Sequence, residues 1–158
     1  MDNIKKLIDS SIEAEKNWRS ADHFIYVLYP AIKDEKLLLR SLENLYKGLV
    51  MAITTVLKLE YIHNKIELSK DQKKNLEIFF RKCALKYGMI ESDLELLKKV
   101  IILGKKHKES GFEFPRNGRV VIMDDEGNTL TLSMDEMKKY LEVVRKLIIN
   151  VKKQLNDG

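Results

Sequence analysis

The sequence predicts a mainly α-helical fold: an antiparallel bundle of about five helices with a β-hairpin inserted before the last helix. Three observations lead to this prediction. Apolar residues recur every three or four positions over most of the chain, the period changes to two between residues 119 and 133, and turn-forming residues separate the segments. The chain has 158 residues and 44% of them are hydrophobic, which suffices for one buried core. We therefore assign residues 1–158 to a single domain.

The first two predicted helices are long. An apolar stripe covers residues 4–28, and Pro30 is expected to end this helix because proline cannot continue one. Asp34 is a suitable N-cap for the second helix, whose stripe covers residues 38–59. Residues 49–57 (LVMAITTVL) carry no charge on any face. We therefore expect other helices to surround the second helix.

The third and fourth helices are predicted from their capping residues. Ser69 and Gln72 match a capping box, in which two side chains satisfy free backbone N–H groups at a helix start. Gly88 is well placed as the left-handed C-terminal cap of this third helix. Ser92 and Glu95 repeat the capping pattern and open the fourth helix. We expect the fourth helix to fray around Gly104, because glycine weakens helices.

A β-hairpin is predicted at about residues 118–133. Two β-branched runs, 119–123 and 129–133, are separated by the acidic, glycine-containing loop 124–128. Two strands alone are marginal in water, so the apolar face of the hairpin must lie on the helices or pair with another chain. A third capping box, at residues 133–136, opens the last helix.

The surplus positive charge lies in one segment. The chain has a formal net charge of +5, and residues 98–119 hold seven basic and two acidic residues, so the rest of the chain sums to zero. This segment also contains three glycines, and we interpret it as a flexible basic stretch that binds RNA or another anion. Ordinary solvated lysines in a turn are the simpler interpretation of the same charges. The candidate contacts are Lys98, Lys99, Lys105, Lys106, His107, Lys108, Arg116 and Arg119.

Two further features of this segment bear on nucleic-acid binding. The lysines around His107 are expected to favour a neutral imidazole by repulsion. Phe112 and Phe114 follow within a few residues and could stack on bases. The simpler expectation is that the two rings pin the loop to the core, because buried aromatic side chains dominate packing energetics.

A second candidate site is a polar cluster on the first helix. It consists of Glu15, Arg19, Asp22, His23 and Tyr26, whose spacing puts them on one helix face. Arg19 can then reach Glu15 and also Asp22 and His23. Such a group could bind an anion or act as the acid and base of a metal-independent hydrolase. The alternative is an ordinary ladder of ion pairs on a solvated face.

The sequence contains no recognised catalytic or metal-binding motif. Its three histidines are scattered, and it has neither paired cysteines nor a glycine-rich phosphate loop. The single Cys83 lies among apolar positions, which favours a buried structural thiol over a nucleophile. No apolar run approaches the ~20 residues that cross a bilayer, and the start lacks the apolar block of a signal peptide. We expect a cytoplasmic protein with no metal, cofactor or membrane partner.

Antiparallel helices with a hairpin before the last one resemble the HEPN superfamily (higher eukaryotes and prokaryotes nucleotide-binding). The resemblance covers residues 3–156 and rests on helix order. It implies a small helical bundle, often dimeric, that is associated with RNA cleavage, toxin–antitoxin pairs or nucleotide binding. The ribonucleases of that family carry Arg, four to six residues and then His, with Arg binding phosphate and His assisting attack by the ribose hydroxyl.

That catalytic motif is absent from this sequence. His107 falls in about the right region, yet positions 100–102 hold valine and isoleucine where the arginine would stand. The nearest approaches to the motif are Arg19 with His23, one residue too short, and Lys58 with His63. The resemblance therefore implies a noncatalytic member, and we carry over no nuclease activity. The alternative function is a structural or protein-interaction module that forms a homodimer without nucleic acid.

Overall fold

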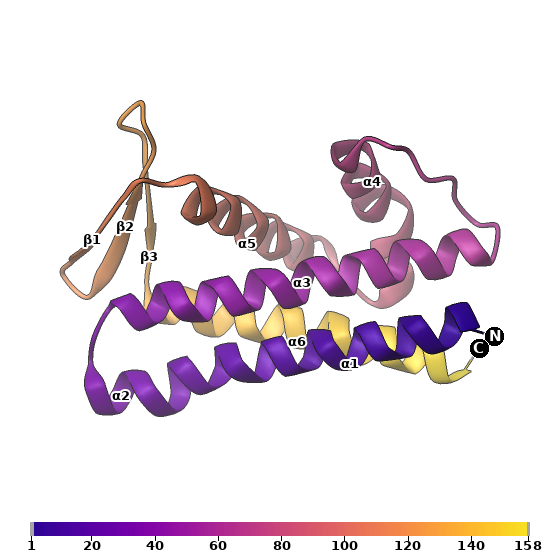
Figure 1. Ribbon diagram of the computed structural model, residues 1–158, viewed down its shortest axis with the longest axis horizontal. Coiled ribbons are helices and arrows are strands. Elements are labelled where there is room, and N and C mark those ends of the chain that lie inside the picture. The colour runs from indigo at the N-terminus through magenta and orange to yellow at the C-terminus, as the bar shows by residue number, and fades with distance from the viewer. Residues whose placement is uncertain (1, 158) are drawn as a thin grey trace.

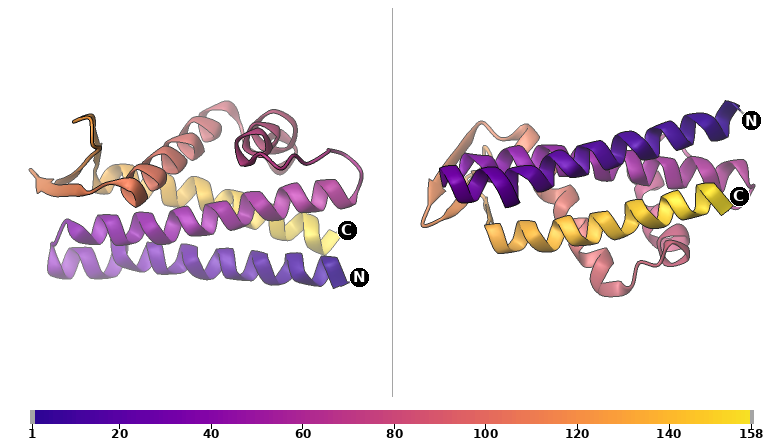
Figure 2. Two further views of the ribbon diagram at one scale, coloured as in Figure 1. Left: turned by 45° about the horizontal axis from the view of Figure 1, so that its top comes forward. Right: turned by 90° about the horizontal axis from the view of Figure 1, so that it is seen from below.

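The computed structural model describes residues 2–157 and confirms the mainly helical fold. Helices α1 and α3 lie side by side and antiparallel, and α6 packs against both of them (Figure 1 and Figure 2). Helix α5 is tilted relative to α3 and packs against α3 and α6. A small sheet lies at the end of the bundle opposite the two chain ends (Figure 1). The long helices are α1 (Asp2–His23), α3 (Lys36–Ile62), α5 (Glu91–Glu109) and α6 (Met134–Asp157).

Helix α3 is the helix that the others surround, as its uncharged stretch predicted. Its residues Leu45, Leu49 and Val56 are fully buried, and α1, α5 and α6 all pack against it. Small residues bring α1 close to α3, since a Cβ at Gly48 would lie 3.0 Å from the carbonyl oxygen of Ala14. The buried core therefore centres on α3.

Pro30 does not end the first helix, contrary to the sequence-based expectation. The helical backbone passes through a π-helical segment, η1 (Phe24–Leu28), and through α2 (Tyr29–Ile32), which contains the proline. In η1 the Tyr29 N–H donates to the carbonyl five residues back rather than four. This wider turn accommodates the ring, which in a regular helix clashes with the carbonyl four residues earlier. The chain reverses at Lys33, whose φ of 56° is left-handed.

The predicted third helix consists of three short elements. They are α4 (Gln72–Ile78), the π-helical η2 (Phe79–Cys83) and the 3-10 helix η3 (Ala84–Tyr87). The expected capping box at Ser69 and Gln72 does not form. Instead Asp71 is the N-cap, and its carboxylate accepts the Lys73 N–H at 2.9 Å. Gly88 ends the segment with a φ of 79°, which confirms the predicted left-handed cap.

Helix α5 differs from its prediction at both ends. It begins one residue before Ser92, and the Asp93 carboxylate accepts the Ile90 N–H at 3.0 Å. It does not fray at Gly104 but continues to its last residue, Glu109. Gly104 is buried against Tyr46 of α3, where an added Cβ would lie 2.2 Å from Cδ1 of the ring. This glycine therefore permits a close helix contact, and the first half of the basic segment is helical rather than flexible.

The sheet has three antiparallel strands in the order β1-β2-β3. Strands β2 (Arg119–Met123) and β3 (Thr129–Leu132) confirm the predicted hairpin, whereas β1 (Phe112–Arg116) was expected to be loop. Strand β1 joins β2 through a tight turn at Asn117 and Gly118, whose φ angles are 53° and 76°. Such angles at two successive residues are typical of a two-residue hairpin turn. Pro115 is tolerated because β1 is an edge strand.

Helix α6 begins with the predicted capping box. The Ser133 N–H donates to Glu136 Oε1 at 3.0 Å, and the Glu136 N–H donates to Ser133 Oγ at 3.2 Å. Among the described residues, no helix combines the length and the apolar character that crossing a membrane requires.

Candidate nucleic-acid interface

Four lysines of the basic segment project from α5 into solvent. Lys98, Lys99, Lys105 and Lys108 are all exposed. Within residues 2–157 no carboxylate lies within ion-pair distance of any of them; the described ion pairs involve other side chains. The Lys98 ammonium lies 5.3 Å from the ring centroid of Phe80. These four charges are therefore available to an anionic partner.

Lys106 and His107, two other members of the segment, join α5 to neighbouring elements. Lys106 contacts the sheet. Its Nζ lies 2.8 Å from Asp124 Oδ2, at the start of the loop between β2 and β3. The hydrogen bond from Lys106 lowers the pKa of Asp124, and two backbone N–H groups of the loop act in the same direction. Lys106 thus ties α5 to the sheet, and its charge is already compensated.

His107, the second, lies between two carboxylates. Its Nε2 is 2.7 Å from Glu43 Oε1 on α3, and its Nδ1 hydrogen bonds to Glu113 on β1. Burial alone lowers the pKa of this imidazole, but the hydrogen bonds to Glu113 and Glu43 outweigh burial and raise the pKa above its ordinary value. The sequence-based expectation considered only the repulsion from neighbouring lysines, and these two carboxylates shift the pKa of the ring in the opposite direction. His107 joins α3, α5 and β1 in one hydrogen-bonded contact.

Replacing His107 with glutamine is expected to destabilise the fold most at acidic to neutral pH. A raised pKa means that the charged ring stabilises fully below its unfolded pKa of about 6.5, and that this contribution disappears as pH rises through the folded pKa. We expect H107Q to lower the free energy of unfolding by about 1 kcal/mol at pH 6 and by less at pH 9. Urea unfolding at both pH values measures this difference, with exposed H63Q as the control. A loss that grows toward pH 9 would contradict the assignment.

Arg116 and Arg119 flank the turn between β1 and β2, and both are exposed. Side chains alternate across a strand, so the register places residues 112, 114 and 116 of β1 on the same face as residues 119, 121 and 123 of β2. Thr131 lies opposite Val121 and Thr129 opposite Met123, so β3 adds two threonines to this face. We call it the outer sheet face. It consists of Phe112, Phe114, Arg116, Arg119, Val121, Met123, Thr129 and Thr131.

The opposite face of the sheet carries its contribution to the core. Val120, Ile122 and Leu132 alternate with the outer residues, are buried and belong to the main core cluster. Phe112, in contrast, is 59% exposed, and its ring centroid lies 5.4 Å from that of Phe114. The expectation that these two rings pin a loop to the core was therefore wrong for Phe112, which faces solvent beside the basic residues.

The predicted polar cluster lies on α1 and, through Tyr26, on η1, and it lines a groove with α6. Four of its five predicted members, all except His23, line this groove of about 680 Å³. Arg19 pairs with Glu15 at 3.2 Å, but within the described residues no ion pair joins Arg19 to Asp22 or His23. The groove is lined by Glu15, Trp18, Arg19, Asp22, Tyr26, Lys138, Lys139, Leu141, Glu142 and Arg145.

Contacts across this groove are mainly those of helix packing. The Trp18 Nε1–H donates to the Leu141 carbonyl at 2.7 Å, and the Arg145 guanidinium lies 5.8 Å from the Trp18 ring centroid. A hydrogen bond from Lys152 lowers the pKa of Glu15, whereas burial raises the pKa of Asp22 against the effect of Arg145. Three acidic and four basic side chains line the groove, so its charge is nearly balanced and it is less suited to a polyanion than α5.

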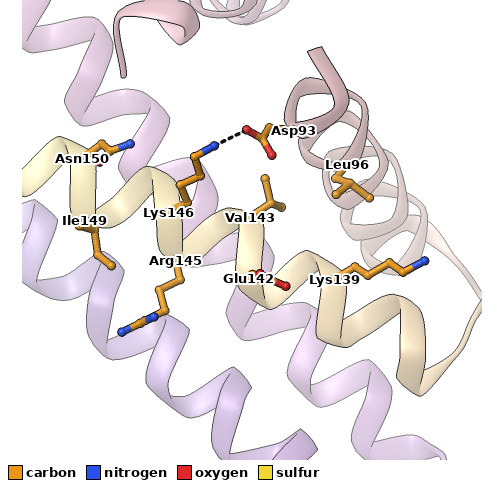
Figure 3. A pocket seen from close by; sticks show the side chains of 9 residues that line it. All are labelled: Asp93, Leu96, Lys139, Glu142, Val143, Arg145, Lys146, Ile149 and Asn150. Carbon is orange, nitrogen blue, oxygen red and sulfur yellow. Dashed lines mark hydrogen bonds and ion pairs between the residues drawn. The ribbon is translucent and has the colours of Figure 1, made fainter. Parts of the chain in front are cut away.

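A further groove, between α5 and α6, was not expected from the sequence. It measures about 540 Å³, and in Figure 3 Lys146 reaches across it to Asp93, with a separation of 2.7 Å. A pattern in the sequence could have indicated such contacts. Basic pairs recur every seven residues along α6, at 138–139, 145–146 and 152–153, and this spacing of about two turns puts them on one side of the helix. Since Asp93 compensates Lys146, this groove is a contact between two helices rather than a free cationic surface.

A buried carboxylate that the sequence did not predict lies near the end of α3. The Glu60 side chain is 3% exposed, lies 2.8 Å from Lys86 Nζ and accepts the Tyr87 hydroxyl hydrogen at 3.1 Å. Burial, and then Glu60, raise the pKa of the neighbouring Cys83 thiol to about 11. Cys83 is itself buried, so the expectation of an inert structural thiol is consistent with its surroundings.

Within the described part of the chain, no three His, Cys, Asp or Glu side chains are arranged to hold a metal ion. Glu43 and Glu113 contact different ring nitrogens of His107 and so do not converge with it on one point. No family model matches the chain, and comparison with curated proteins and with solved structures finds no match. The HEPN-like relationship is not tested by these comparisons and stays a prediction.

Proposed function

We propose that this protein binds RNA or another phosphate-rich partner through residues 98–119. The observation that supports the proposal is that most basic side chains of this segment are exposed and, within residues 2–157, unpaired, whereas two are paired with carboxylates. Lys106 and His107 are compensated by carboxylates, whereas six basic side chains are exposed and none of them is part of an ion pair in the described structure. The six are Lys98, Lys99, Lys105, Lys108, Arg116 and Arg119.

The arrangement suits a long anion better than a small one. The lysines lie along α5, which leads directly into β1, and the two arginines follow at the turn between β1 and β2. Positive side chains distributed over this length bind a phosphate backbone by releasing its condensed counterions, without reading a sequence. The compensated pair Lys106 and His107 contributes by holding α5 against the sheet, so that the lysines of α5 and the two arginines keep a fixed spacing.

In this proposal the protein acts as a noncatalytic HEPN-like bundle in the cytoplasm. The missing arginine–histidine motif supports a binding role rather than cleavage. If the protein is instead an interaction module without nucleic acid, it should form a dimer in solution and bind no RNA at low salt.

Reversal of three lysine charges is expected to weaken RNA binding strongly. For mixed-sequence RNA and wild-type protein, we expect affinity to fall by about 10³-fold between 50 and 200 mM salt, as for six phosphate contacts. The triple variant K98E/K105E/K108E should lose at least about 100-fold in affinity at 50 mM salt. Fluorescence anisotropy measures both effects.

The matched control changes the same amount of charge elsewhere. Lys5, Lys6 and Lys70 are exposed and lie outside the basic segment, so K5E/K6E/K70E alters the net charge equally. If both triple variants weaken binding to the same extent, the effect is one of net charge and the proposed interface is wrong. Wild-type binding that does not depend on salt would overturn the proposal as well.

A further inference from the structure

The outer sheet face carries one aromatic side chain, Phe112, that packing does not bury, beside two exposed arginines. Phe114 is half-buried opposite Val121, which is 5% exposed, so Phe114 presents only part of its ring to solvent. The inner face already supplies Val120, Ile122 and Leu132 to the core. Phe112 nevertheless lies on the outer face of an edge strand with 59% of its surface exposed. Phe112 contacts Phe114 and pairs with Met123, so these three side chains form an apolar patch beside Arg116 and Arg119, and apolar patches rimmed by polar residues mark binding sites.

The order of side chains along β1 matches the order of groups in a nucleotide. Phe112 and Phe114 stand next to one another with their ring centroids 5.4 Å apart, and Arg116 follows on the same face. Two residues along a strand advance about 7 Å. A base stacked on Phe114 therefore has its neighbouring phosphate within reach of Arg116, and of Arg119, which is paired with Arg116 across the turn.

We propose that the outer sheet face binds single-stranded nucleic acid, with bases stacking on Phe112 and Phe114 and phosphates held by Arg116 and Arg119. This inference rests on the proposed function, because it names the kind of polyanion that the basic segment binds. Bases in a duplex are stacked on one another and present no free face to a phenyl ring, whereas an unpaired base does. The phenyl rings thus select single strands, and the lysines of α5 add affinity for any phosphate backbone.

Charge also favours this occupant over a second copy of the chain. The outer sheet face holds two arginines and no acidic residue, and exposed threonines complete it on β3. Two copies meeting through this face would bring four arginines into one interface without a carboxylate. A single strand instead supplies the negative charge and the aromatic surface that the face lacks.

The test compares four probes of equal length or charge: a single-stranded RNA, a DNA of the same sequence, the RNA duplex and polyphosphate. Wild-type protein should bind both single strands at least tenfold more tightly than the duplex. The variant F112A/F114A should lose about 10- to 100-fold in affinity for single strands and keep its affinity for duplex and polyphosphate. The ratio between the affinities for RNA and DNA shows which of the two strands the outer sheet face prefers.

Two further variants separate stacking from folding. F112L/F114L keeps apolar side chains at both positions without aromatic rings and should lose as much single-strand affinity as the alanine pair. F112Y/F114Y keeps the rings and should bind like wild type. The control Y61A/L85A removes exposed apolar side chains that lie outside the sheet, and its affinities should not change.

The outcomes distinguish this inference from the proposed function. Salt-dependent binding of all four probes with equal affinity, unchanged in the phenylalanine variants, overturns the stacking inference and leaves the proposed function intact. Absence of binding to every probe at low salt overturns both. A wild-type dimer that F112A/F114A converts to a monomer overturns the inference too, because the face is then a protein interface.

Discussion

Replacing Gly104 with leucine is expected to lower the free energy of unfolding by about 3 kcal/mol. A Cβ at this position would lie 2.2 Å from Cδ1, 2.4 Å from Cγ and 2.8 Å from Cβ of Tyr46. These atoms are close to the Tyr46 backbone, so a rotation of the ring does not clear them all. Helices α3 and α5 must then separate, although leucine itself favours a helix over glycine by about 0.8 kcal/mol. Urea unfolding monitored by circular dichroism measures the loss.

Gly111 provides the matched control. It lies just beyond α5, and a Cβ added to it would have no heavy atom within 4 Å, so Gly111→Leu should change stability by less than about 0.5 kcal/mol. The variant Y46A/G104A should be more stable than the sum of its two single variants predicts, because removing the ring makes room for the methyl group. If G104L is as stable as wild type, Gly104 is not a packing requirement and helix α5 continues past it for another reason.

The helices that could be predicted from the sequence depend on local patterns. The uncharged stretch 49–57 identified the central helix, and the capping box of Ser133 and Glu136 formed as expected because its partners are three residues apart. The end of α5 could not be predicted, since Gly104 is stabilised in the helix by Tyr46 on a different element. A glycine that ends a helix and a glycine that admits a neighbouring ring look the same in a sequence.

The candidate interface was predictable in charge but not in pairing. Counting residues located the surplus charge at 98–119, yet which of these side chains are free depends on contacts between distant elements. Lys106 meets Asp124 across the sheet loop, and His107 meets Glu43 of α3. The outer sheet face depends on β1. This strand could not be predicted because it contains Pro115, which is unfavourable in most strands, and because only a two-residue turn separates it from β2. Only the register with β2 shows that residues 112 and 116 share a face with Arg119.

A large effect is also expected when the buried carboxylate of Glu60 loses its cationic partner. Lys86→Met leaves Glu60, 3% exposed, with the Tyr87 hydroxyl as its remaining donor at 3.1 Å. Burial, followed by the charge of Glu60, raises the pKa of Tyr87, so this hydroxyl stays protonated and continues to donate. Breaking a fully buried pair costs about 3–5 kcal/mol. Because the Lys86 side chain is 44% exposed and water can enter, we expect a loss of about 2–3 kcal/mol here.

A control variant at Lys82 and a rescue substitution at Glu60 test whether the loss of stability comes from the unpaired carboxylate. Lys82 is exposed and lies one turn before Lys86, so Lys82→Met should alter stability by less than about 0.5 kcal/mol in the same urea experiment. Adding Glu60→Gln to Lys86→Met removes the unpaired charge but keeps an oxygen that accepts from Tyr87, and it should recover more than half of the loss. Equal stability of the Lys82 and Lys86 variants would mean that the carboxylate is satisfied without the ammonium. If the double variant does not recover stability, the loss comes from the packing of the Lys86 side chain rather than from its charge. Its methylene groups would then be the part of Lys86 that stabilises η3 against α3.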